Sequence, residues 1–268
     1  MGISHNNNKT IIYMIGFEEI FKEWHNEFPL LSKYTDRTLF FILKPYMAGL
    51  RLSKPRFGTD EYRVYFEIIP LWENDNKSFG IPLCYPVLKI KQGKCLCPDI
   101  KFKLHDSLFH EAVESAEHQF GIILKEEVLY KELMIFIDRI ISSFQLKHNP
   151  YDWIDVFKLQ LGLAMYFDKQ NLLDCIHNNI MQEISYWTPK NIKYGDILSV
   201  EEWRKKIYTG LEDRNKFMEA IEMNCQRPKV TKLNVAHIIG IEEYTVNEYT
   251  KDITELSWRE RLRSFFSK

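Results

Sequence analysis

The spacing of apolar residues changes once along this chain, near residue 105, and this change constrains the fold more than any other feature. Before that point, apolar and polar residues alternate over short runs, as at Tyr62, Val64 and Phe66. Alternation is typical of half-buried β-strands, because successive side chains point to opposite faces of the sheet. After that point, apolar residues recur every three or four positions, which is typical of amphipathic helices. Strands followed by helices predict an α+β fold.

The first part of the chain is predicted to hold one helix and a small sheet. Apolar residues at three- and four-residue steps predict a helix over residues 16–28, which Pro29 can end. Four or five strands follow, mostly antiparallel because their connections are short. The strand-like runs are residues 39–43, 50–52, 62–68, 88–91, 94–97 and 100–104, with Gln92-Gly93 as a tight turn.

The second part is predicted to be almost wholly helical. The helical runs are residues 106–119, 125–144, 153–167, 172–187, 199–208, 213–225 and 258–266, and residues 235–241 are a further strand candidate. Asp106 or Ser107 is a candidate cap for the first helix, and Ser199 with Glu202 matches a capping box. Asn149-Pro150 marks a boundary without a Gly/Ser linker. We therefore expect two closely packed regions, residues 1–149 and 150–268.

Composition narrows the class of protein and its location. The 268 residues include 36 basic and 37 acidic ones, so the chain as a whole is not a polyelectrolyte. It has neither a secretory signal pattern nor the run of about 20 apolar residues that a membrane helix needs. Five scattered cysteines do not form a disulfide framework and favour the reducing cytoplasm. The abundance of Ile, Lys, Asn, Tyr and Phe indicates a low-GC bacterial or phage genome.

The sequence lacks the common catalytic signatures. It contains no G-x-S-x-G, G-x-x-x-x-G-K or G-x-G-x-x-G, which disfavours serine hydrolases, NTPases and dinucleotide enzymes. We therefore expect no cofactor and favour a non-catalytic function over an enzyme.

One group of residues has the donor types of a zinc site. Thiolates, imidazoles and carboxylates are the ligands of Zn²⁺ in proteins. However, the spacing matches no standard motif, and His110 and His118 lie about 12 Å apart along one helix axis. A metal-dependent hydrolase is therefore a third hypothesis, and a solvated helix face is the simpler interpretation. The candidate ligands are Cys95, Cys97, His105, His110 and Glu114.

Basic residues gather in the predicted strands. If the strands pair, these residues can share the outer face of the sheet with Tyr46, Phe57 or Tyr65. Basic sheets with exposed aromatic residues commonly bind single-stranded nucleic acid. The simpler interpretation is a polar outer face whose lysines discourage edge pairing. The candidate residues for this second hypothesis are Arg51, Arg63, Lys89, Lys91, Lys101 and Lys103.

Aromatic residues of the helical part support the preferred hypothesis, which is protein binding. Trp203, Tyr208, Trp258 and Phe265 are of the types that anchor interfaces, although most aromatic residues belong to protein cores. Without catalytic motifs, the chain is predicted to bind another macromolecule, most simply another protein. A toxin-neutralising, phage-defence or counter-defence accessory factor fits this description.

Overall fold

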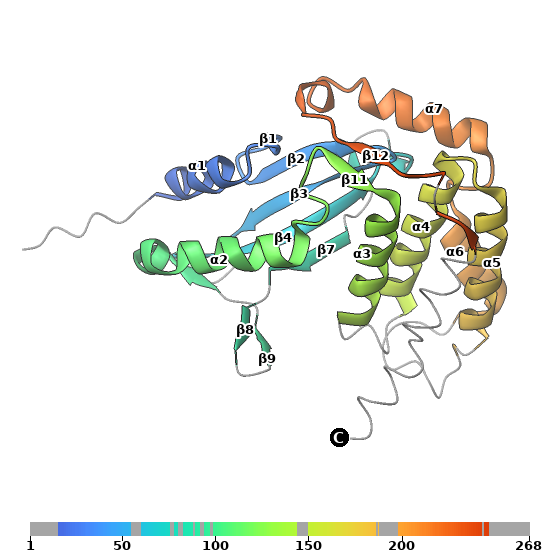
Figure 1. Ribbon diagram of the computed structural model, residues 1–268, viewed down its shortest axis with the longest axis horizontal. Coiled ribbons are helices and arrows are strands. Elements are labelled where there is room, and N and C mark those ends of the chain that lie inside the picture. The colour runs from blue at the N-terminus through green and yellow to red at the C-terminus, as the bar shows by residue number, and fades with distance from the viewer. Residues whose placement is uncertain are drawn as a thin grey trace, which may run out of the picture.

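The computed structural model describes residues 16–54, 60–75, 78–79, 83–87, 89–91, 94–96, 99–143, 150–185, 187, 198–242 and 244–246. It has an N-terminal helix, then an antiparallel sheet, then mostly helices (Figure 1). This order confirms the predicted α+β fold.

The main sheet is an antiparallel meander extended by two short strands. Strands β1 (Ser32–Lys33), β2 (Thr38–Leu43), β3 (Tyr46–Ser53) and β4 (Glu61–Pro70) pair in chain order. The far edge of β4 pairs with both β7 (Leu83–Pro86) and β10 (Ile100–Lys101), at different positions along its length. In this register Arg51 of β3 lies opposite Tyr65 of β4.

Two predicted strands differ from the structure. The predicted hairpin forms as β8 (Lys89–Lys91) and β9 (Lys94–Leu96), but it is a separate two-stranded sheet, like β5 (Asn74–Asp75) with β6 (Ser78–Phe79). The run 100–104 is a strand only in β10, because the chain then turns into the short 3₁₀ helix η1 (Phe102–Leu104).

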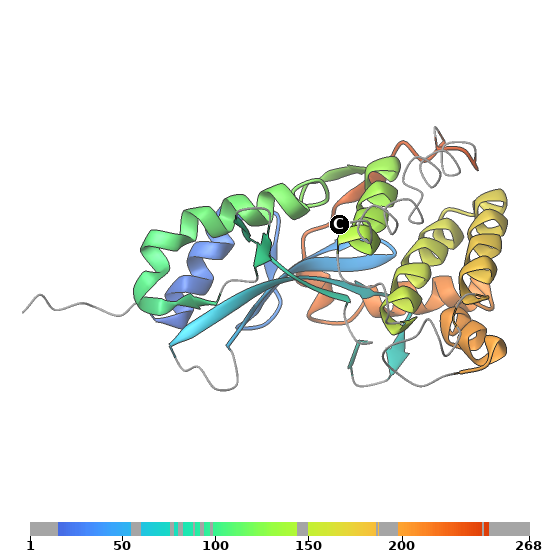
Figure 2. The same cartoon turned by 90° about the horizontal axis from the view of Figure 1, so that it is seen from below.

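Helices α1 (Phe17–Glu27) and α2 (His105–Phe120) cover one face of the main sheet (Figure 2). The rings of Phe66 and Phe120 stack at 4.5 Å, and Trp24 meets Phe109 edge-on at 5.5 Å. Neither predicted residue caps α2, because the helix continues directly from η1 and Ser107 Oγ donates to the Leu104 carbonyl oxygen at 2.9 Å.

A pair of parallel strands stands where sequence spacing predicts the start of a helix. Strand β11 (Glu127–Leu129) pairs with β12 (His237–Ile239), and α3 (Tyr130–Ser143) begins only after β11. The apolar spacing at Val128 and Leu129 fits a helix equally well, so the distant partner strand decides the local structure. The strand predicted at residues 235–241 is confirmed as β12.

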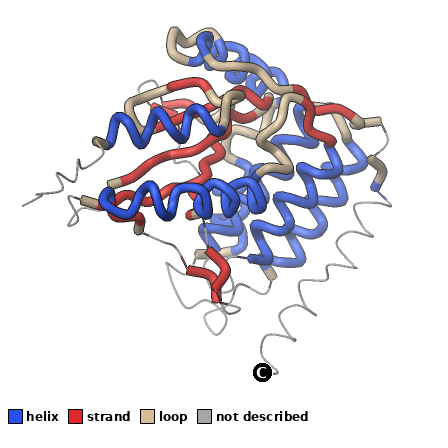
Figure 3. Tube along the Cα trace, turned by 60° about the vertical axis from the view of Figure 1, so that its left-hand side comes forward, coloured by secondary structure: helices blue, strands red, loops and turns tan. Residues whose placement is uncertain are grey.

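The C-terminal part consists of α4 (Pro150–Tyr166), α5 (Gln170–Ile184), α6 (Val200–Tyr208), α7 (Arg214–Cys225) and the 3₁₀ helix η3 (Val230–Lys232). Figure 3 shows α3, α4 and α5 gathered beyond the end of the sheet, and α4 packs against both neighbours. The predicted capping box is confirmed, since the Ser199 side chain accepts from the Glu202 N–H and Glu202 accepts from the Ser199 N–H.

Trp72, just beyond β4, joins the sheet to the helices. Its ring lies 5.6 Å from the Tyr46 ring and 5.2 Å from the Phe217 ring. It also lies directly on Gly162 of α4, where an added Cβ would come within 2.3 Å of the Trp72 ring. Residues on both sides of Pro150 thus belong to one buried core, and the division into two regions stays a prediction.

The contact between Trp72 and Gly162 predicts a specific coupling. Gly162→Ala is expected to destabilise the fold by about 1–3 kcal/mol through overpacking, despite the better helix propensity of Ala. Trp72→Phe removes the ring atoms that the new methyl group meets. Urea unfolding should therefore show Gly162→Ala to be less damaging in the Trp72→Phe background, with a coupling of about 1 kcal/mol. An equal effect in both backgrounds would contradict the contact.

Candidate functional site

A surface groove of about 730 Å³ opens between the ends of α1 and α2 and the segment that leads into β12. Its lining consists of residues 27–31, Glu117, Gly121, residues 124–126 and Asn234 with Val235. The lining is mixed: the half-buried Leu30 and Leu124 lie beside polar and charged groups, and Phe28 and Leu31 are buried beneath. We call this feature the groove.

Asn234 fixes the shape of the groove by joining parts of the chain that are far apart in sequence. Its side-chain amide donates to the Leu30 carbonyl oxygen at 2.8 Å, and its backbone N–H donates to Ser32 Oγ at 3.0 Å. Its carbonyl oxygen accepts from the Ile42 N–H at 2.8 Å, and the Ala236 N–H donates to the Ile42 carbonyl oxygen at the same distance. The groove wall is therefore anchored on both the loop after α1 and the edge of β2.

The exposed face of the β11–β12 pair continues the groove. Side chains alternate along this segment, so Val235, His237 and Ile239 share one outward face. In β11, Leu129 lies opposite Ile239 and Glu127 lies opposite His237. Val235 is 50% exposed, Leu129 41% and Ile239 36%, which is unusual for such large apolar residues close together. We call Val235, His237, Ile239, Leu129 and Glu127 together the strip.

Acidic side chains surround the groove and the strip. Glu27, Glu117 and Glu126 line the groove and are exposed, and Glu127 belongs to the strip. Within the part of the chain that the structure describes, none of these four forms an ion pair. The one lysine of the lining, Lys125, lies 2.5 Å from Glu132 Oε2 and is neutralised by it. The site therefore presents net negative charge.

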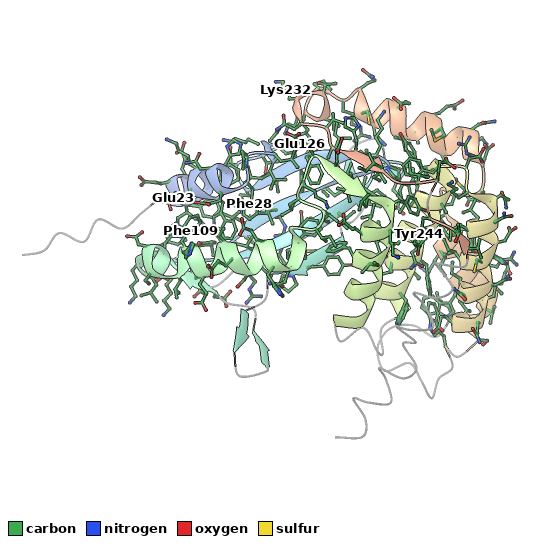
Figure 4. All side chains as sticks on the ribbon, in the orientation of Figure 1. Glu23, Phe28, Phe109, Glu126, Lys232 and Tyr244 are labelled. Atoms are coloured by element: carbon green, nitrogen blue, oxygen red, sulfur yellow. The ribbon has the colours of Figure 1, made fainter. Side chains whose placement is uncertain are left out.

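Figure 4 labels two residues that line the groove. Phe28, at the end of α1, and Glu126, just before β11, mark the groove, and both are labelled there. The figure also labels Tyr244, whose ring lies 5.3 Å from the Tyr130 ring at the start of α3. Tyr244 therefore packs against the buried start of α3.

The candidate zinc ligands do not come together among the described residues. His105 is fully buried, with Nδ1 2.8 Å from the Tyr62 hydroxyl oxygen and Nε2 2.8 Å from Glu23 Oε2. Both ring nitrogens thus have protein partners, and Trp24 Nε1 donates to the same hydroxyl group at 3.3 Å. His105 is a structural residue that joins α1, α2 and β4.

The other zinc candidates lie apart from His105. His110 Nε2 is 3.2 Å from Glu114 Oε1, and the His110 side chain is 87% exposed. Cys95 lies in β9 with its side chain outside the described part, and Cys97 is outside the described residues altogether. In the described parts of the chain, no three His, Cys, Asp or Glu residues are placed to hold a metal ion.

Arg51, one of the basic candidates, lies in the main sheet among groups that balance its charge. Arg51 pairs with the buried Glu67, stacks over the Tyr65 ring at 4.7 Å and lies 3.1 Å from Cys84 Sγ. Burial, with the Glu67 carboxylate beside it, raises the pKa of Cys84 to about 11, so this thiol stays protonated near neutral pH. The Arg51 cluster therefore has its charges balanced internally.

The remaining basic candidates are spread over four elements, β4, β8, β10 and η1. Arg63 donates to both carboxylate oxygens of Asp99, at 2.8 and 2.9 Å. Lys101 and Lys103 are exposed on β10 and η1, whereas Lys89 and Lys91 belong to the separate β8–β9 hairpin. Of the aromatic residues expected among them, Tyr46 is buried, Tyr65 is half-buried, and Phe57 is outside the described residues.

Two of the four aromatic residues predicted to anchor a partner, Trp203 and Tyr208, lie among the described residues. Trp203 is 1% exposed and contacts Trp187 edge-on at 5.2 Å, so it belongs to the core. Tyr208 is half-buried, its hydroxyl group lies 2.5 Å from His177 Nδ1, and burial raises its pKa to about 12. Trp258 and Phe265 are outside the described residues.

Sequence reasoning missed every residue of the groove and the strip. Their apolar members sit in short loops and short strands, where spacing gives no signal, and they meet only through pairing between distant segments. The excess of acid in and after α2 was visible in the sequence, but not the exposed aliphatic side chains of the strip beside it.

Comparisons of this chain with protein-family models, with curated proteins and with solved structures gave no match. Among the described residues, no helix has the length and apolar character needed to cross a membrane. The functional argument therefore rests on the geometry of the groove and the strip.

Two histidines of α2 provide a matched test of the buried network. His105→Leu is expected to lower the free energy of unfolding by about 1–3 kcal/mol, because it leaves the buried Tyr62 hydroxyl group with fewer partners. The same substitution at the exposed His110 should change it by no more than about 0.5 kcal/mol. Urea unfolding of both variants measures this difference, and similar values for the two would refute the structural role of His105.

Proposed function

We propose that this protein is a non-catalytic protein-binding factor whose binding site is the groove together with the strip. The observation that supports the proposal most strongly is the continuity of the groove and its acidic rim with three exposed aliphatic side chains, Val235, Leu129 and Ile239. Removal of the exposed aliphatic surface from water on association supplies the driving force for binding. The negative charge of the acidic rim selects the partner. The partner segment is therefore cationic and amphipathic.

The dimensions of the strip agree with a short helix or an extended peptide. The five residues from Val235 to Ile239, in extended conformation, span about 13 Å. A helix of two to three turns has about the same length. A partner helix with one apolar stripe can place that stripe on Val235, Leu129 and Ile239, with basic side chains reaching Glu117, Glu126 and Glu127. Helix-in-groove binding is a recurrent mode of peptide recognition.

A factor of this kind works by occupying a segment of another protein. Toxin-neutralising, phage-defence and counter-defence factors act in this way, and the proposal extends to that class of activity in a bacterial or phage setting. The acidic site distinguishes among such partners, because it disfavours acidic segments and nucleic acid and favours basic ones.

The charge of the groove gives a direct test. We consider a fluorescently labelled 14-residue peptide in which Leu and Phe recur every three or four positions and Arg stands between them. This peptide, the Arg-Leu/Phe peptide, is expected to bind the wild-type protein. Binding should weaken at least about tenfold in the Glu117→Lys/Glu126→Lys variant, because two rim charges change sign. Fluorescence anisotropy measures both affinities, and a scrambled peptide of the same composition reports the contribution of charge alone.

A matched control carries the same change in net charge elsewhere. Glu201→Lys/Glu219→Lys reverses two exposed carboxylates on α6 and α7, away from the groove, and is expected to leave peptide affinity within about twofold. Equal losses in both variants would show that net charge, not the groove, governs binding. Tighter binding of a single-stranded oligonucleotide than of the peptide would favour the alternative, nucleic-acid binding, with Lys101 and Lys103 among the residues to test next.

A further inference from the structure

We propose that this protein forms a two-fold symmetric dimer in which the groove of each copy receives a basic surface of the other. This inference rests on the proposed function, because it names a second copy of this chain as a partner of the groove. It is supported by the position of the basic surface beside the groove, by its charge and by an exposed apolar side chain between the two surfaces.

The basic surface is formed by the turn after β1 and by the segment that runs from the end of α7 through η3. Lys229 Nζ lies 5.7 Å from the centre of the Tyr34 ring, so the two segments are in contact. Lys229 and Lys232 project from one side of η3, because side chains three residues apart eclipse in a 3₁₀ helix. Residues 223–241 contain no acidic residue. We call the five basic residues of the two segments the patch: Lys33, Arg37, Arg227, Lys229 and Lys232.

The patch carries a net positive charge. The turn after β1 contains one carboxylate, that of Asp36, which lies 3.1 Å from Lys33 Nζ. Within the described chain, Arg37, Lys229 and Lys232 are exposed and form no ion pair. The patch therefore has the opposite charge to the four unpaired carboxylates of the groove and the strip.

The patch and the groove are neighbours because the same two segments carry both. Residues 27–31 line the groove, and Lys33 of the patch follows two positions later. On the other segment, Lys232 of the patch precedes Asn234 of the groove lining by two positions. The hydrogen bond from the Asn234 N–H to Ser32 Oγ, at 3.0 Å, joins the two segments where the patch meets the groove.

Two neighbouring surfaces of opposite charge make this side of the molecule self-complementary. Around a two-fold axis, the patch of each copy meets the groove of the other, and both contacts form at once. An axis placed at Val235, which is 50% exposed, also brings the two copies of this side chain together and removes them from water. Charge then sets the orientation of the two copies, and a cationic partner has to compete with the second copy for the groove.

Charge exchange between the two surfaces tests the dimer. Lys229→Glu/Lys232→Glu and Glu117→Lys/Glu126→Lys should each weaken it at least about tenfold, because like charges then face each other. In an equimolar mixture of the two variants, every contact again joins opposite charges. A mixed dimer should therefore form with an affinity within about threefold of the wild type. Sedimentation velocity over about a hundredfold range of protein concentration measures these affinities.

Two further variants control for net charge and for folding. Lys205→Glu/Lys216→Glu makes the same change in net charge on α6 and α7 and should dimerise like the wild type. A chain with all four patch and groove substitutions exchanges the signs of the two surfaces and should dimerise as well. A wild-type protein that stays monomeric, or a mixture that forms no mixed dimer, would overturn the proposal. Assembly that continues beyond the dimer would also overturn it, because a head-to-tail contact does not close.

The Arg-Leu/Phe peptide separates failure of this inference from failure of the proposed function. It should dissociate the wild-type dimer by mass action. It should also bind Lys229→Glu/Lys232→Glu at least about threefold more tightly than the control of equal net charge, whose groove is still occupied. Peptide binding to a wild-type protein that is monomeric at every concentration would refute the dimer and leave the groove as a binding site. If neither the peptide nor a second copy binds, both proposals fail.

Discussion

The structure around the candidate site depends on backbone pairing by one short segment, residues 234–239. Asn234 and Ala236 bind both backbone groups of Ile42 at the edge of β2, and the His237 N–H donates to the Glu126 carbonyl oxygen at 2.8 Å. The Asn234 side chain joins this segment to the loop after α1 as well, through its hydrogen bond to the Leu30 carbonyl oxygen. These bonds join three parts of the chain that no local preference would bring together. The groove and the strip exist only because of this pairing.

The same pairing explains why apolar side chains remain at the surface there. A two-stranded pair has two faces, and the body of the protein covers only one of them, where Val128 is buried. The other face carries Leu129 and Ile239 outward, beside the acidic end of α2. On the main sheet, by contrast, Arg51 pairs with Glu67 and Arg63 pairs with Asp99. The groove and the strip combine unbalanced charge with exposed apolar area, which is the combination that protein interfaces use.

Much of the fold could be predicted from sequence, because long elements carry strong periodic signals. The alternation in β4, the apolar spacing of α1 and α4, and the Ser199 capping box all identified their elements correctly. The failures concern short segments whose structure is set by distant partners. Glu127–Leu129 has helical spacing but becomes a strand because β12 pairs with it. His105 looked like a metal ligand, yet it is held by Tyr62 and Glu23 from other elements. The residue type of His105 suggested metal binding, but its burial and its hydrogen-bond partners give it a structural role.

The central claim is that the groove and the strip bind a cationic amphipathic segment. Methyl-labelled NMR tests it most directly, because Leu30, Leu124, Leu129, Val235 and Ile239 all carry methyl groups at the site. Titration with the Arg-Leu/Phe peptide is expected to shift these signals together, and to leave the methyl groups of α5 and α6 unchanged. Shifts that map to α5 and α6, or a saturating interaction that leaves these five residues unperturbed, would contradict the account.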